Sequence, residues 1–246
     1  SPPSPAATPC APGSSLGGAR PKAGVIDKDG RLCIAKFPSR KDTHDVGVWE
    51  FVVHQLANAA GIEVSPATLQ RFGDEGHTYV SRRFDRTESG GRKAFVSAMT
   101  MLQRNDGEPG ASYLELVELL QTRGANTRSD CAQLFRRVVF NICVSNTDDH
   151  LRNHGFFIEA NGLVLSPAYD MNPNTERREL SIAIDEVNAT CDVDVALRAA
   201  SGYGLSAADA DAIVSEVRTA VAKWRDEAAS MGIARGEQNR MQTAFR

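Results

Sequence analysis

The residues best suited to chemistry lie between Ser145 and Asp170, in the stretch SNTDDHLRNHGFFIEANGLVLSPAYD. Asp148 and Asn153 are separated by four residues, and a second carboxylate, Asp170, follows an apolar hairpin pattern. One carboxylate can orient and deprotonate an attacking hydroxyl, while an amide and a second carboxylate supply the oxygen ligands that Mg²⁺ binds. Phosphoryl transfer from a nucleotide is the chemistry that such a set would serve.

The spacing of Asp148 and Asn153 equals that of the catalytic loop of protein kinases, although Asn-Thr stands where His-Arg is usual. A structural interpretation is equally open, because Asp, Asn and His also collect in loops where they cap helices and form turns. The short motif alone does not distinguish the catalytic interpretation from the structural one.

Two elements must position this stretch. The apolar run from Ser129 to Ser145 predicts a helix with Ser129 as its N-cap, and this helix delivers the polar cluster. After the cluster, residues 155–158 and 163–165 predict a hairpin that turns at Asn161-Gly162.

A second candidate is Lys36, at the end of an apolar strand. Residues 22–26 and 31–37 predict a hairpin, in which Lys36 shares a face with Leu32 and Ile34. A lysine on such a face needs an anionic partner, and Glu50 of the predicted helix 46–60 could supply it. The alternatives are a lysine that extends to solvent and a solvated glutamate.

The remaining elements are predicted from apolar periodicity and turn residues. Strands are expected at 68–72 and 77–84, with a connection to a helical region after Arg82-Arg83-Phe84. Leu180 to Val187 reads as a strand or an extended segment. Helices are expected at 113–122, 192–200 and 206–231.

Composition sets outer limits. The chain is 41% hydrophobic and 24% charged, and its formal charge of −3 argues against a broad nucleic-acid surface. No apolar run approaches the ~20 residues of a membrane span. Five cysteines without a CxxC pair favour a reducing cytoplasm. Residues 1–13 predict a disordered lead, and the absence of an initial Met is compatible with a fragment.

Four segments in order, SSLGGARPK, RRFDR, NTDDHLRNHGFF and LSPAYD, resemble the HipA-like family of bacterial serine/threonine toxin kinases. The resemblance extends from Ser14 to the C-terminal helices. It implies a two-lobed, protein-kinase-like α+β fold, with a β-rich nucleotide-binding lobe at 14–85 and a mainly helical catalytic lobe at 86–246.

The resemblance also implies roles for individual residues. Asp148 would be the catalytic base, with His150 beside the transferring phosphate, and Asn153 and Asp170 would bind Mg²⁺. ATP binding would fall to Gly17, Gly18, Ala19, Arg20, Lys22, Lys36, Glu50, Arg82, Arg83, Phe84 and Tyr169. Ser15, or alternatively Ser14, lies where the family's autophosphorylated serine is found. This chain departs from the family at Arg82, where a glutamate is frequent, and at Pro21, which removes an amide donor.

The expected reaction is transfer of the ATP γ-phosphoryl group to a protein Ser or Thr. By resemblance, the target is a translation component such as an aminoacyl-tRNA synthetase. The implied partners are a DNA-binding antitoxin and a small N-terminal subdomain, which in some systems is a separate polypeptide. Two alternatives stay open: a catalytically inactive kinase fold that acts as a corepressor subunit, and a small-molecule kinase. Direct contact with nucleic acid or membrane is not expected.

Overall fold

This computed structural model describes residues 8–9, 20–73 and 76–246. They form two compact units. The first contains the described residues up to Phe51 together with Ser65–Lys93, and the second contains Val52–Val64 and Ala94–Arg246. The chain passes between the units three times, after Phe51, after Val64 and after Lys93. The expected division into a nucleotide-binding lobe at 14–85 and a catalytic lobe at 86–246 stays a prediction.

The first unit is built on an antiparallel sheet with the strand order β1-β2-β3-β5-β4. Its strands are β1 (Thr8–Pro9), β2 (Lys22–Ile26), β3 (Leu32–Lys36), β4 (Ala67–Arg71) and β5 (His77–Arg82). Asp27 forms the turn between β2 and β3, where its carboxylate accepts hydrogen bonds from two backbone amides and Gly30 has a φ of +76°.

One face of this sheet closes over a small apolar cluster of Val25, Cys33, Ala35 and Val80. The fully buried residues of β3 therefore include Cys33 and Ala35, whereas Leu32 and Ile34 are half-buried. The sequence pattern had suggested the opposite face as the more buried one. Lys36 is nevertheless buried, for a reason given below.

Helix α1 (Val46–Ala59) begins in the first unit and ends in the second. At its start, the carboxylate of Asp45 accepts hydrogen bonds from the amides of Val48 and His77, at 3.3 and 3.1 Å. At its end, Gly61 has a φ of +75°, and the amide of Ile62 donates back to Ala57. The predicted helix and its terminal glycine are confirmed.

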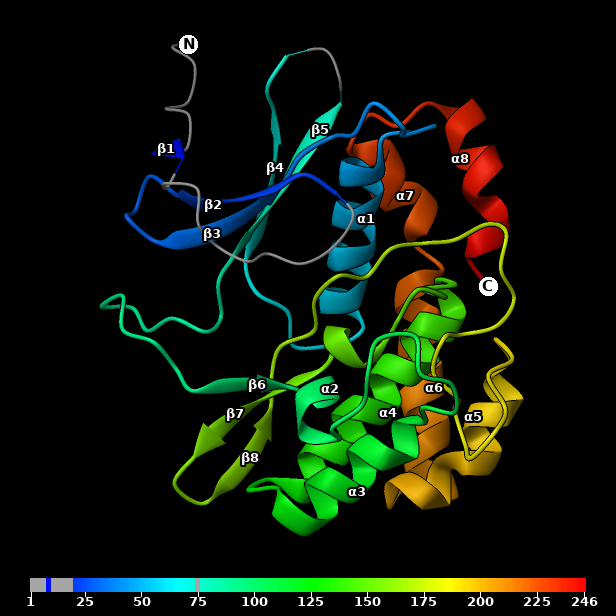
Figure 1. Ribbon diagram of the computed structural model, residues 1–246. Coiled ribbons are helices and arrows are strands. Elements are labelled where there is room, and N and C mark those ends of the chain that lie inside the picture. The colour runs from blue at the N-terminus through cyan, green and yellow to red at the C-terminus, as the bar shows by residue number, and fades with distance from the viewer. Residues whose placement is uncertain (1–7, 10–19, 74–75) are drawn as a thin grey trace. The chain divides into compact units, whose positions relative to one another are not determined.

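The second unit is organised around α4 (Thr127–Cys143), which lies between α3 (Tyr113–Arg123) and α6 (Ala207–Val221), with α5 (Val193–Ala199) against it (Figure 1). Its large apolar side chains, Leu134, Phe135, Val138, Val139, Phe140 and Ile142, are at most 1% exposed because neighbouring helices cover them. The helix starts earlier than predicted, at an N-cap Asn126, so Ser129 is not the cap; its hydroxyl donates to Asn126 O inside the first turn.

A three-stranded antiparallel sheet completes the region that follows α4. Its strands are β6 (Phe95–Ser97), β7 (Gly155–Glu159) and β8 (Gly162–Leu165), with β7 in the middle. The hairpin of β7 and β8 is confirmed where the sequence placed it. Strand β6, which leads into the short helix α2 (Ala98–Met101), was not predicted.

The C-terminal helices differ from the single long helix that we expected at 206–231. Helix α6 ends at Val221, and a separate α7 (Trp224–Ser230) follows after a turn, with α8 (Arg235–Met241) beyond it. The ring of Trp224, at the start of α7, stacks on that of Phe245 near the C-terminus, with the ring centres 4.5 Å apart. Among the described residues, no helix combines the length and the hydropathy that crossing a membrane would need.

Candidate active site

The two adjacent carboxylates of the loop at 145–154 have different environments. Asp148 is exposed, whereas Asp149 is 3% exposed. The loop directly follows α4, and the short 3-10 helix Leu151–Asn153 ends it before β7 begins. Of these two carboxylates, only that of Asp148 is open to solvent, and its role as a catalytic base stays a prediction.

Asp149 lies at the centre of a buried polar cluster. Its Oδ2 accepts hydrogen bonds from the hydroxyl of Tyr113 at 2.5 Å and from the amide of Asn141 at 3.0 Å, and it lies 2.7 Å from His154 Nε2. Burial acts to raise the pKa of Asp149, but the charge of His154 and the hydrogen bonds with His154 and Tyr113 outweigh it and hold that pKa below its ordinary value. The carboxylate is thus kept ionised and anchors the loop.

The sequence signalled this cluster only weakly. Asp149 was visible as one of many polar residues, and no role was assigned to Tyr113 or Asn141. A buried tyrosine beside a carboxylate has its pKa raised well above normal, by burial and by the charge of Asp149. The signal that could have been used is an asparagine inside an otherwise apolar helical face, since such a residue needs an internal partner.

A second set of hydrogen bonds joins this loop to the loop that carries Asp170. The amide group of Asn146 donates to Asn141 Oδ1 at 3.0 Å, and its own oxygen accepts the backbone amide of Asn172 at 3.1 Å. The hydroxyl of Tyr169 donates to the carbonyl of Arg152 at 2.6 Å. The structure therefore links the loop of Asp148 and Asn153 to the loop of Asp170.

The oxygen atoms of Asn153 and Asp170 suit a hard divalent cation. Asn153 donates its amide nitrogen to Asp148 O at 3.5 Å, which leaves its oxygen as the atom able to bind a cation. Asp170 has a φ of +60°, a strained backbone for a residue with a side chain.

Within the described residues, no group of three or more His, Cys, Asp or Glu gathers as a metal site. Mg²⁺ commonly takes one or two protein oxygens and completes its shell with phosphates and water. The donor set of this loop pair fits that arrangement.

The predicted ion pair is present in the first unit. Lys36 Nζ donates to Glu50 Oε1 with both residues buried, and the ammonium group lies 5.6 Å from the ring centre of Tyr79. This explains how a lysine at the end of β3 can be buried. Its assignment to ATP phosphates stays a prediction.

The approach of α1 to β5 brings Glu50 to this position. A Cβ on Gly47 would lie 2.2 Å from His77 O, so only glycine permits the approach. The ring of His77 also lies 2.6 Å from the carboxylate of Asp45, which ties the start of the helix to the start of β5.

The other residues assigned to ATP have the following surroundings. Lys22 lies opposite Lys36 in the register of β2 and β3. Arg20 forms an ion pair with Asp42, and Arg82 forms one with Glu88. Arg83 pairs with Asp85 at 2.5 Å, while its backbone amide donates to Leu32 O. The side chains of Arg82 and Arg83 thus form ion pairs with carboxylates, and their nucleotide contacts stay predictions, as does that of Phe84.

The remaining residues predicted for the phosphate loop and for autophosphorylation lie outside the described residues. They are Gly17, Gly18, Ala19, Ser14 and Ser15.

The family model for the HipA-like C-terminal domain matches residues 14–224. This chain belongs to that family. A curated relative, named "Putative kinase Y4mE" in Sinorhizobium fredii, is 25% identical over 191 residues, which are 68% of this chain and 44% of the relative.

Two solved structures share the fold. A chain of the toxin–antitoxin complex of HipA, HipB and operator DNA from Shewanella oneidensis MR-1 gives a TM-score of 0.74 at 19% identity, covering 94% of this chain and 62% of that one. The Helicobacter pylori proinflammatory kinase CtkA gives 0.55 at 11% identity, covering 86% and 94%. The α+β, protein-kinase-like fold is thereby shown. This HipA-like chain spans less than two thirds of the Y4mE protein and of the Shewanella chain.

Proposed function

We propose that this HipA-like chain is the core of an ATP-dependent serine/threonine protein kinase. The observation that carries the proposal is the joined pair of loops in the second unit, where Asp148 is exposed and the oxygens of Asn153 and Asp170 suit Mg²⁺. The buried Lys36–Glu50 pair in the first unit gives independent support, because kinases hold ATP phosphates with such a lysine.

In this proposal each residue has one task. Asp148 orients the hydroxyl of the acceptor Ser or Thr and receives its proton. Asn153 and Asp170 hold Mg²⁺, which when bound neutralises charge on the transferring phosphoryl group. Lys36 binds the ATP phosphates, and Glu50 keeps the ammonium group in place. His150 lies beside the transferring group, and Asp149 holds the loop rigid so that little reorganisation is needed during transfer.

The protein context is proposed from the family. The substrate would be a translation component such as an aminoacyl-tRNA synthetase, so that its phosphorylation stops growth. The Shewanella structure contains HipB and operator DNA, which supports a DNA-binding antitoxin as partner of this chain too. This chain covers 62% of the matching chain in that structure. We propose that a small N-terminal subdomain, on the same or a separate polypeptide, is a further partner of this kinase core.

Autophosphorylation is expected at Ser15 or Ser14. A phosphate carries a charge of about −1.5 to −2 at neutral pH. It would repel the phosphates of ATP from the Gly-rich segment and silence the enzyme. Phosphomimetic Ser14→Asp and Ser15→Asp chains should therefore bind ATP more weakly than the unmodified chain.

The test is incubation with Mg-ATP followed by mass spectrometry of the chain and of candidate acceptor proteins. Transfer to Ser or Thr that is lost in Asp148→Asn, and retained in the matched surface variant Asp211→Asn of α6, supports the proposal. If the unmodified chain transfers nothing, an inactive corepressor subunit is favoured. Transfer to a sugar or antibiotic, with none to protein, would identify a small-molecule kinase.

A further inference from the structure

The connection between α2 and α3 is a loop held by several side-chain hydrogen bonds. We call residues 104–110 the arch. It contains two left-handed glycines, Gly107 and Gly110, with φ of +75° and +81°, and a Cβ on either would meet no atom within 4 Å. These glycines are therefore required by the backbone conformation and not by crowding.

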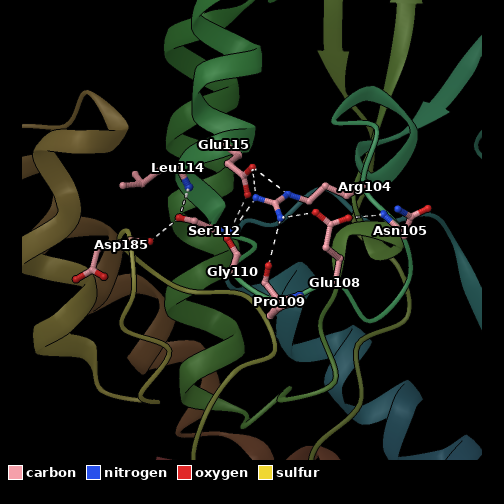
Figure 2. Close-up of polar contacts among 9 residues, drawn as sticks. All are labelled: Arg104, Asn105, Glu108, Pro109, Gly110, Ser112, Leu114, Glu115 and Asp185. Carbon is pink, nitrogen blue, oxygen red and sulfur yellow. Dashed lines mark hydrogen bonds and ion pairs between the residues drawn. The ribbon is translucent and has the colours of Figure 1, made fainter.

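Arg104 holds the arch in shape from inside (Figure 2). Its Nη2 donates to Glu115 Oε1 at 2.7 Å and its Nε to the same oxygen at 3.1 Å. Nη1 donates to Glu108 Oε1 and to the carbonyl of Pro109, and Nη2 also donates to the carbonyl of Gly110, each at 3.3 Å. A planar group with five donors is suited to such a task, and lysine could not reproduce it.

The base of the arch is fixed to the body of the second unit. Ser112 caps α3, and its hydroxyl donates to the carbonyl of Asp185 at 2.5 Å (Figure 2). Glu115 accepts the backbone amide of Ser112 at 3.0 Å with its other oxygen, while it binds Arg104. One carboxylate thus serves both the helix cap and the arch.

The arch presents Asp106 to the candidate catalytic loop. Asp106 forms an ion pair with Arg152, which lies one residue before Asn153. Arg152 Nη2 in turn lies 3.1 Å from His150 Nε2, and because a guanidinium group can only donate, Nε2 must accept. The Nδ1 atom of His150 is buried and has no hydrogen-bond partner among the described residues. The ring orientation therefore depends on Arg152.

We propose that Asp106 and Arg104 are positioning residues: the arch fixes Arg152, and through it the ring of His150, beside Asp148. This inference rests on the proposed function, since it assigns the arch a role in phosphoryl transfer. Isolated surface ion pairs of such exposure, 71% for the Asp106 side chain and 43% for that of Arg152, contribute little to stability. The hydrogen bonds of Arg104 that support this ion pair therefore indicate that the pair positions the catalytic loop, and not that it stabilises the fold.

The experiment compares four variants with the unmodified chain. Asp106→Asn removes the ion pair, Arg104→Gln removes the support of the arch, and Asp106→Glu restores the charge. Glu216→Gln is the matched control, because it breaks an ion pair with Arg136 at 2.6 Å in the same unit, and within the described part of the chain Glu216 forms no hydrogen bond or ion pair with the loop at 145–154.

We expect kcat to fall about tenfold in Asp106→Asn and Arg104→Gln, since displaced catalytic groups lose rate more than binding. The KM for ATP should stay unchanged in both variants, the melting temperature should stay unchanged in Asp106→Asn, and Asp106→Glu should recover most of the rate. Glu216→Gln should behave as the unmodified chain. If Asp106→Asn transfers phosphate as well as Glu216→Gln does, the inference is overturned while the kinase proposal stands.

A second measurement tests the positioning role of Asp106 independently of the proposed kinase activity. The amide of Asn153 donates to His150 O at 2.7 Å and should exchange its hydrogen slowly. Asp106→Asn should accelerate that exchange several-fold, and Glu216→Gln should not. Unchanged exchange in Asp106→Asn contradicts the positioning role, whether or not the chain transfers phosphate.

Discussion

Asp149 Oδ2 and His154 Nε2 lie 2.7 Å apart in the interior of the second unit, one residue on either side of the segment that carries His150 and Asn153. The contact joins the two ends of this segment. Asp149 is therefore committed to a structural role, whereas a chemical role is expected of Asp148, although the two residues are of the same type.

The first prediction concerns Asp149→Asn and pH. The folded state lowers the pKa of Asp149 from its ordinary value of 3.8, so its ionisation stabilises the fold above that value, and this contribution is lost as the pH falls through the folded-state pKa. We expect the variant to lose about 1–3 kcal/mol at pH 7, because one buried donor set loses its acceptor. The difference from the unmodified chain should shrink below pH 3.8. Urea unfolding at pH 7, 5 and 3 measures it; a constant difference would contradict the assignment.

The second prediction concerns the contact between α1 and β5. Gly47→Ala places a methyl group 2.2 Å from His77 O and should destabilise the first unit by about 1–3 kcal/mol. Gly24→Ala is its control, because a Cβ there meets nothing within 4 Å. Chemical denaturation followed by tryptophan fluorescence should show a lower midpoint for Gly47→Ala alone. Equal midpoints would mean that the helix can move away at little cost.

The third prediction concerns the buried ion pair. Lys36→Met removes the ammonium partner of Glu50, and a buried carboxylate deprived in this way costs about 3–5 kcal/mol. The double variant Lys36→Met/Glu50→Leu should recover most of that loss, since neither charge then remains. Both chains should fail to bind ATP if the proposed function holds. A double variant less stable than the single one would show that Glu50 has a more important partner than Lys36.

The fourth prediction concerns backbone strain at Asp170. Its φ of +60° is costly for a residue with a side chain, so Asp170→Gly should be more stable than Asp170→Ala by about 1 kcal/mol. Both variants lack the carboxylate, and both should lose Mg²⁺-dependent ATP binding. Thermal unfolding, together with calorimetric titration of Mg-ATP, measures the two effects. If Ala and Gly are equally stable at this position, the strain is not real.

Much of the fold could be read from local patterns. The β2–β3 and β7–β8 hairpins have turn residues, Asp27 to Gly30 and Asn161-Gly162, that encode the reversal within a few positions. The pairing of Lys36 with Glu50 was likewise predictable, because a lysine on an apolar strand needs a carboxylate and the next helix offers one.

Other features depend on contacts between distant segments. Strand β6 is three residues long and exists because it pairs with β7, some sixty positions later. The N-cap of α4 was misplaced because Ser129 is a good capping residue by type, whereas the helix is fixed one turn earlier at Asn126. Likewise, Leu180 to Val187 forms bends with an isolated pairing to Ser112 in place of a regular strand.

The candidate site shows the same division. The spacing of Asp148 and Asn153 marked the loop, but which of two adjacent aspartates faces solvent is decided by Tyr113 and Asn141, which lie on separate helices. The local sequence does not show which of the two aspartates is buried.

One of the ties between the loops of Asp148 and Asp170 passes through Asn146, which binds Asn141 on one side and the backbone of Asn172 on the other. Every group in this tie is an uncharged amide. Ions in the medium screen attractions between charges far more than they weaken dipolar bonds of this kind. We therefore expect the distance between the two loops to change little with ionic strength. The loops would then already have their spacing when a highly charged nucleotide binds.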